Sequence, residues 1–296
     1  MEEKIEIRKV RDFGEIIGDT FIFLSRNFKK LFKSLLFIVL PFNIIGTTAL
    51  AYFQYNFIGS FGTKSVIAGY NWDSLISSGW SYLLTIVISI ISYTFSISVT
   101  YRFITLYEIG DEYDVKELWD YAKKDFFKIL FANIGIFFLV VIGVVICFFP
   151  GIYIGVVLLL VFPIMLTENI GFYASISRSF KLISDNWWLT FALIFVIAII
   201  QSVIAYTFIL PAMIFGGLSS IFSTNNTNGL MSFQLITTIV SHLVSTFTQP
   251  ILITALALHY FSLVEKKESV GILRKIETIG NNKSGSLSDP DEVETY

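Results

Sequence analysis

Six long apolar runs divide this sequence and constrain its fold more than any other feature. A helix needs about 20 mostly apolar residues to cross the hydrocarbon layer of a membrane, because each residue advances it by only ~1.5 Å. The qualifying runs cover residues 35–52, 80–101, 126–149, 152–166, 187–210 and 232–261. Backbone amides cannot stay unpaired in lipid, and no alternating strand pattern indicates a barrel. The sequence therefore predicts an all-α membrane protein with six transmembrane helices.

The amino-acid composition also indicates a chain that is surrounded by lipid. Hydrophobic residues make up 54% of the 296 residues and charged residues 15%, against about 25% charged in soluble domains. A globule of this size has too little interior for 30 Phe, 14 Tyr and 5 Trp beside the long aliphatic runs. The net charge of −2 excludes a nucleic-acid binder, and the single cysteine excludes a disulfide scaffold. We expect Cys147 to be a small apolar residue inside a helix.

The basic residues lie almost entirely on one side of the predicted spans. Every one of the 21 Lys and Arg residues except Lys64 falls before the first span, after the last, or in or next to the loops between spans two and three and between spans four and five. Short loops rich in Lys and Arg stay in the cytoplasm, so we expect both termini there and an uncleaved first span. The expected organisation is a cytoplasmic N-terminal segment, 1–33, a six-helix transmembrane domain, 34–264, and a largely disordered polar tail, 265–296.

Three segments that lead into spans align without gaps and predict a three-fold internal repeat. Each has an aromatic residue and, six positions later, a polar one: Phe21 and Asn27, Trp119 and Asp125, Phe180 and Asn186. Apolar residues at helical spacing before each polar position predict three amphipathic in-plane helices at the headgroup level. We expect the polar residue to cap the span that follows. Bases on the polar face of the first helix predict contact with anionic inner-leaflet lipids.

Few residues within the spans could carry chemistry. Every charged side chain can be placed outside the bilayer centre, which weakens the case for an ion-coupled carrier. A candidate polar pocket between the fifth and sixth spans consists of uncharged residues: Gln201, Gln234, His242 and Gln249. The alternative interpretation is ordinary hydrogen bonding between helices. His259, at the inner end of the sixth span, is expected to be an interfacial side chain.

A charged cluster follows the fourth span and forms a candidate cytoplasmic docking face. Its members are Glu168, Arg178, Lys181 and Asp185. The alternative is a solvated helix face with surface ion pairs, which are common and weak. An enzyme, the third and least favoured hypothesis, would have to use Glu168 and Asp185. The chain contains no phosphate loop, nucleophile elbow, zinc-protease motif or CxxC, so we expect no catalytic residues, no cofactor and no metal.

The stretch FFPGIYIGVVLLLVFPIMLTENIGFYASISRSFKLISDNWW, residues 148–188, carries a family resemblance. It resembles a bacterial family of stand-alone, uncharacterised membrane proteins, and the membrane domain that precedes some glycerophosphodiester phosphodiesterases. The shared elements are the Pro150-Gly151 turn, Pro163, Glu168, the helix containing Ser179, and Trp187-Trp188. The resemblance implies a helical bundle with in-plane helices in a bacterial inner membrane. It does not imply diesterase activity, because the chain has no room for the catalytic barrel outside its spans.

These observations favour a non-enzymatic membrane protein that acts as a scaffold or as a partner subunit of a membrane complex. The alternative is a permease or a lipid-handling protein that uses the apolar and amide-lined surfaces around Gln201, Gln234 and His242. Expected partners are membrane lipids, including anionic ones, and membrane or cytoplasmic proteins.

Overall fold

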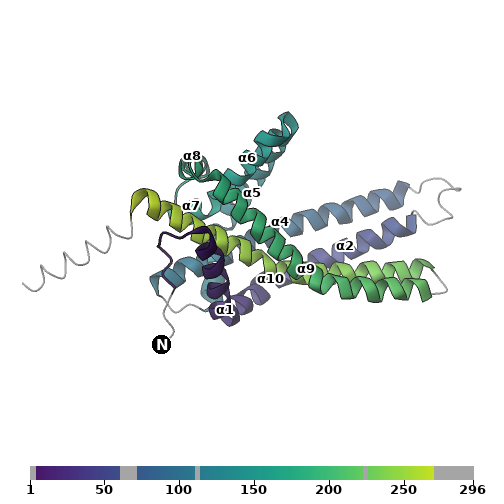
Figure 1. Ribbon diagram of the computed structural model, residues 1–296. Coiled ribbons are helices and arrows are strands. Elements are labelled where there is room, and N and C mark those ends of the chain that lie inside the picture. Colours follow the sequence, from purple (N-terminus) through teal and green to yellow (C-terminus); the bar gives the residue numbers. More distant parts are fainter. Residues whose placement is uncertain (1–4, 61–71, 111–113, 223–225, 270–296) are drawn as a thin grey trace, which may run out of the picture.

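The computed structural model describes residues 5–60, 72–110, 114–222 and 226–269. In these ranges the chain is helical without strands, which confirms an all-α fold. The helices shown in Figure 1 are α1 (Phe13–Ile38), α2 (Leu40–Ser60), α4 (Trp72–Ile109), α5 (Val115–Ile146), α6 (Phe148–Leu158), α7 (Val161–Thr167), α8 (Phe172–Ile183), α9 (Trp187–Phe222) and α10 (Asn226–Glu268). The predicted tail from 270 onward and the loop holding Lys64 lie outside the described residues.

Long apolar helices account for the predicted spans. Within the described residues, five segments are long and apolar enough to cross a membrane: Gly79–Ile109, Val115–Ile146, Phe148–Thr167, Trp187–Phe215 and Phe233–Glu268. A sixth is obtained when α1 and α2, which meet at an angle of 50°, are taken together. The chain is thus a multi-pass membrane protein. The helix of the last span extends past the predicted domain boundary at 264 to Glu268.

The first span differs from the prediction at its start. The amphipathic α1 does not end near Lys33 but continues to Ile38, and the bend falls at Val39. Pro41 explains this position, because it has no N–H to donate to the carbonyl of Phe37 four residues earlier. Residues 35–38, predicted to begin the span, therefore belong to α1, and the membrane-crossing direction is set from Leu40.

The helices are arranged as three hairpins that share one end. In Figure 1, α2 lies beside α4 and α9 lies beside α10, and these two pairs extend in a similar direction. The α5–α6 hairpin points away from both. The shared end contains α1, α8, the short α7 and the second half of α10. Its core consists of large, fully buried side chains, among them Phe23, Phe103, Leu118, Ile164 and Phe261. Beyond this core the hairpins expose apolar side chains, as helices in lipid do.

The α5–α6 turn lies three residues before the predicted position. Cys147, with φ −163° and ψ 133°, separates the two helices, while Pro150 and Gly151 already belong to the first turn of α6. Pro150 is tolerated there because the first N–H groups of a helix have no helical acceptor. Cys147 was predicted to lie inside a helix, but it lies between α5 and α6 and is exposed. The span formed by α6 and α7 is also interrupted, at Leu159 and Leu160, because Pro163 cannot donate to the carbonyl of Leu159.

Two of the three aligned polar residues do not stand at the start of a span, so the predicted common cap is wrong for them. Asn27 lies inside α1, where its amide donates to the carbonyl of Phe23 at 2.9 Å. Asp125 lies inside α5, which runs unbroken through both the predicted in-plane helix and the span. Asn186 alone stands directly before a span. Its backbone carbonyl accepts from the backbone N–H of Thr190, whereas its side-chain oxygen accepts from the ammonium of Lys266 at 3.3 Å. The alignment thus assigned one role to three residues that lie in different environments. The internal repeat itself stays a prediction.

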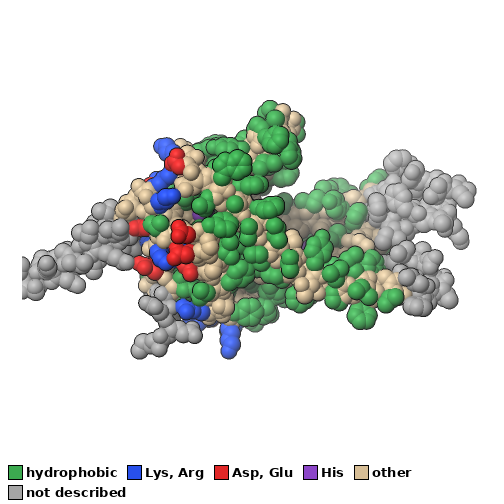
Figure 2. All heavy atoms as spheres, viewed as in Figure 1, with side chains coloured by type: hydrophobic (Ala, Val, Ile, Leu, Met, Phe, Trp, Pro, Cys, Tyr) green, Lys and Arg blue, Asp and Glu red, His purple; other side chains and the backbone are tan. Residues whose placement is uncertain are grey.

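Charged side chains gather at the shared end of the hairpins, as Figure 2 shows, and we call this the charged end. Residues before α1 take part in it. The backbone N–H of Ile5 donates to the hydroxyl of Tyr107 on α4 at 3.1 Å, and Arg8 pairs with Glu108 at 2.5 Å. The backbone N–H of Arg11 donates to the hydroxyl of Ser262 on α10 at 2.9 Å. The N-terminal segment is therefore packed against α4 and α10.

Candidate functional site

The four residues of the predicted polar pocket do not form one compact site. On α10, Gln234 and Gln249 are separated by 15 residues, or ~22 Å at ~1.5 Å per residue. The amide of Gln201 donates to the backbone carbonyl of Thr248 at 2.6 Å and thereby joins α9 to α10. His242 lies elsewhere, on the walls of two grooves beside α2. For Gln201, the alternative of hydrogen bonding between helices describes what the structure shows.

A large groove with His242 on its wall lies between the hairpins. We call it the His242 groove. It has a volume of about 710 Å³ and is lined by Leu50, Tyr82, Thr85, Ile86, Ser89, Ile90, Tyr93, Asn133, Ile134, Phe137, Phe138 and His242. These side chains come from α2, α4, α5 and α10. The volume is within the ~300–1,000 Å³ typical of small-molecule sites. The lining is apolar with a few uncharged hydrogen-bonding groups.

A polar network that sequence reasoning missed lies next to this groove. The amide of Asn43 on α2 donates to the hydroxyl of Thr246 at 2.5 Å, and its carbonyl oxygen accepts from Ser92 at 2.6 Å. Three helices, α2, α4 and α10, therefore meet at one side chain. Asn43 also lines a smaller groove of about 290 Å³, between α2 and α10, that reaches the other side of His242. The available signal was a lone amide within the first apolar run.

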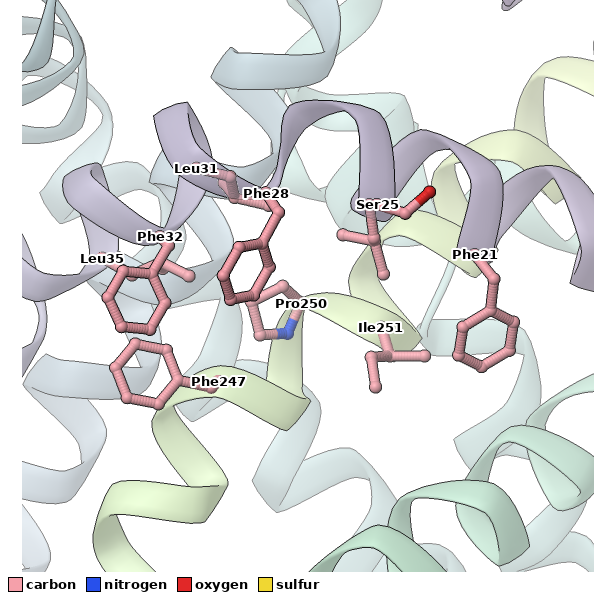
Figure 3. Close-up of a pocket in the computed structure, with 10 residues that line it drawn as sticks. Phe21, Ser25, Phe28, Leu31, Phe32, Leu35, Phe247, Pro250 and Ile251 are labelled. Atoms are coloured by element: carbon pink, nitrogen blue, oxygen red, sulfur yellow. The ribbon is translucent and has the colours of Figure 1, made fainter.

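The apolar face of α1 covers a third groove, shown in Figure 3 and called here the Pro250 groove. Its volume is about 220 Å³, and its lining residues are Phe21, Leu24, Ser25, Phe28, Leu31, Phe32, Leu35, Phe247, Pro250 and Ile251. In Figure 3 the ring of Phe32 faces that of Phe247, and their centroids are 4.4 Å apart. Ser25 is its one polar lining residue, and its hydroxyl donates to the carbonyl of Ile22. This groove can hold apolar chains but has no titratable group.

The structure does bring together the predicted docking face, and it adds the end of α10 to it. Arg178 donates from Nε to both carboxylate oxygens of Glu168 at 3.1 Å, and from Nη2 to Glu268 at 2.8 Å. Tyr260 donates its hydroxyl proton to Glu168 at 2.9 Å. The hydrogen bond to Glu268, followed by that to Glu168, raises the pKa of Arg178 above its ordinary value. Arg178 thus joins α8 to the segment before it and to the last helix.

The other two residues of this face are bound by Lys267. Its ammonium lies 3.0 Å from the carboxylate of Asp185 and donates to the backbone carbonyl of Lys181 at 2.7 Å. The hydrogen bond from Lys267 lowers the pKa of Asp185 below its usual range. Lys181 therefore contributes its carbonyl, not its charge. The ion-paired helix face, the alternative interpretation, describes these contacts, and the face is bridged by the protein's own α10.

Two buried contacts near the charged end involve residues that the sequence assigned to other roles. Arg102 on α4 forms a two-point ion pair with Asp125 on α5, at 2.5 and 2.9 Å. His259 is 1% exposed, so it is a core residue rather than an interfacial one. Its Nε2 lies 2.8 Å from the hydroxyl of Thr190 on α9. Each contact joins two consecutive helices, between residues that are 23 and 69 positions apart.

Comparison of the chain with protein-family models, curated proteins and solved structures finds no match. The resemblance of residues 148–188 to the diesterase membrane domain therefore stays a prediction. The structure gives local roles to some of the residues that carry it: the hydroxyl of Ser179 donates to the carbonyl of Val157, joining α8 to α6. In the described ranges, no three His, Cys, Asp or Glu residues are grouped so that they could hold a metal ion.

Proposed function

We propose that this multi-pass membrane protein binds and handles membrane lipids, and that the His242 groove holds a lipid chain. The observation that carries the proposal is the groove itself: about 710 Å³ of largely apolar space between hairpins, with no charged residue in its lining. A soluble or ionic substrate would need charged or many polar wall groups to replace its water. A lipid chain needs none.

The position of the groove supports the same ligand class. Phe137 and Phe138 line it and are 62% and 57% exposed, so the groove opens sideways among side chains that face the surroundings. A lipid could then enter from the bilayer without crossing water. The amide of Asn133 and the imidazole of His242 are neutral groups that can bind an ester or hydroxyl oxygen. The amide of Asn133 also donates to the hydroxyl of Thr94, which fixes its orientation.

The location and membrane orientation form part of the proposal. The gathering of Lys and Arg at the charged end supports placing that end, and with it both termini, in the cytoplasm. The resemblance in residues 148–188 supports a bacterial inner membrane. In this proposal the protein binds or transfers lipids and has no catalytic chemistry of its own.

The test uses the full chain in vesicles with a phospholipid that carries a photoreactive group in its acyl chain. We expect adducts concentrated on the groove residues of α4 and α5, and lipid movement between leaflets that His242→Leu reduces severalfold. Ser202→Ala is the matched control, because Ser202 is an exposed α9 residue whose hydroxyl binds only its own helix at Ala198. Adducts spread evenly over all lipid-facing helices, with unchanged movement in His242→Leu, would contradict the proposal.

The second candidate function is a scaffold or partner subunit. The ordered charged end favours it, because the segment before α1, α8 and the end of α10 are fixed there by ion pairs. The face around Arg178 is already bridged internally, so a partner would have to bind beside it or displace Glu268. Crosslinking in native membranes should then recover one stoichiometric protein partner. Recovery of the chain alone would count against this function and leave the lipid proposal in place.

A further inference from the structure

A fourth groove lies at the charged end, where α1 bends into α2 and α5 begins. We call it the Lys33 groove. It has a volume of about 570 Å³, and its lining residues are Lys33, Phe37, Ile38, Pro41, Phe42, Asp114, Val115, Lys116 and Trp119. It differs from the other three grooves in combining two cationic side chains with aromatic rings. Its lining residues come from the end of α1, the start of α2 and the start of α5, so the bend at Val39 lies beside it.

The two lysines of this groove are available for an anion. Both are exposed, and no carboxylate in the described residues lies within ion-pair distance of either. By contrast, several other bases of the charged end are paired: Arg8 with Glu108, Arg11 with Asp19, Arg102 with Asp125, Arg178 with Glu168, and Lys267 with Asp185. The carboxylate of Asp114 accepts from the backbone N–H of Val115 at 2.8 Å and caps α5.

The floor of the groove leads into an aromatic cluster. Phe42 stacks on Phe95 with 4.9 Å between ring centroids, and Phe95 lies 5.3 Å from Trp119 and 4.9 Å from Phe126. An aromatic surface of this kind beside lysines suits a ligand that is charged at one end and apolar at the other. A free phosphate or a small soluble anion would leave it uncovered.

We propose that the Lys33 groove binds the headgroup of an anionic phospholipid, with the phosphate between Lys33 and Lys116 and the upper part of its chains against Trp119 and Phe42. The inference rests on the proposed function, because it supplies the headgroup specificity of a lipid-handling protein. On α5, 14 residues separate Trp119 from Asn133 of the His242 groove, which is ~21 Å of helix. A lipid held here therefore points its chains along α5 toward that groove.

The experiment measures how much phosphatidylglycerol, relative to phosphatidylcholine, the full-length protein retains after transfer from mixed vesicles into mild detergent. The test variant is Lys33→Gln with Lys116→Gln. The control, Lys29→Gln with Lys124→Gln, removes the same charge from exposed positions of the same two helices, α1 and α5, outside the groove. We expect the test variant to lose about fivefold in retention for each lysine and the control less than twofold. Lys33→Arg with Lys116→Arg should retain the lipid, and Asp114→Asn should retain more of it.

The outcomes separate this inference from the proposed function. Equal retention in the test and control variants would overturn the headgroup site, even if acyl-chain adducts still form in the His242 groove. Displacement of the lipid by glycerol phosphate in solution would also overturn it, because the ligand would then be a soluble phosphate. Loss of the His242-groove adducts with normal phosphatidylglycerol retention would contradict the proposed function and leave the headgroup site standing.

Discussion

At the scale of single residues, polar side chains in the apolar middle bind one another across helices. Asn43 joins three helices through Ser92 and Thr246, and Gln201 joins two through a backbone carbonyl. Such bonds contribute about 0.6 kcal/mol each and up to ~1.7 kcal/mol in membrane proteins. Their larger effect is on register, because a side chain with two fixed partners allows only one relative position of the helices.

We expect Asn43→Ala to lower the free energy of unfolding by about 1–2 kcal/mol, since it removes two hydrogen bonds between helices. Thr48→Ala is the control: Thr48 lies on the same helix and is exposed, and its hydroxyl binds only the carbonyl of Ile44. Unfolding in mixed micelles of increasing denaturing-detergent content gives the comparison. Equal midpoints for the two variants would show that the Asn43 network does not stabilise the packing of α2, α4 and α10.

At the scale of helices, prolines set the breaks and a glycine sets the closest packing. A Cβ atom on Gly151 would lie 2.6 Å from the backbone nitrogen and 2.7 Å from the Cα of Val144 on α5. Backbone atoms cannot move aside cheaply, so α5 and α6 are close here because residue 151 has no side chain. The sequence assigned Gly151 to the turn, but the turn is at Cys147 and Gly151 is required by helix contact.

Gly151→Ala should force α6 away from α5 and reduce stability by about 1–3 kcal/mol. Gly155→Ala, one turn later on the same helix, should be nearly neutral, because its added Cβ would meet Val140 at 3.9 Å, an ordinary contact. Spin labels on the outer parts of α5 and α6 would measure the separation directly. An unchanged distance distribution in Gly151→Ala would contradict the close contact.

At the scale of the whole molecule, three hairpins share one charged end, and the polypeptide returns to it after each hairpin. This arrangement requires Lys124 on α5 and Lys181 on α8 to be on the same side of the membrane. With Cys147 replaced by Ser, single cysteines at 124 and 181 should react with a membrane-impermeant maleimide from the same face of oriented vesicles. Reaction from opposite faces would refute the topology and, with it, the placement of the Lys33 groove.

Hydropathy could predict most of this fold because lipid imposes the length and composition of each span. Contacts between helices leave no such pattern. Glu168 and Arg178 are close in sequence and were grouped correctly, whereas Glu268 joins them from 90 residues beyond Arg178. Asp125 was interpreted as a helix cap, because no local sequence pattern indicates that its ion-pair partner, Arg102, lies on the preceding helix. Pro41 did signal the bend at Val39, but the signal lies within an apolar run that otherwise predicts a straight helix.

The attachment of Arg11 to Ser262, 251 residues later, has a consequence for biogenesis. Each hairpin can enter the bilayer as it leaves the ribosome. The segment before α1 can then bind α4, but it cannot complete its contacts until α10 has been made. A nascent chain that stalls before α10 therefore lacks the contact between Arg11 and Ser262, and completion of the charged end becomes the last step of assembly.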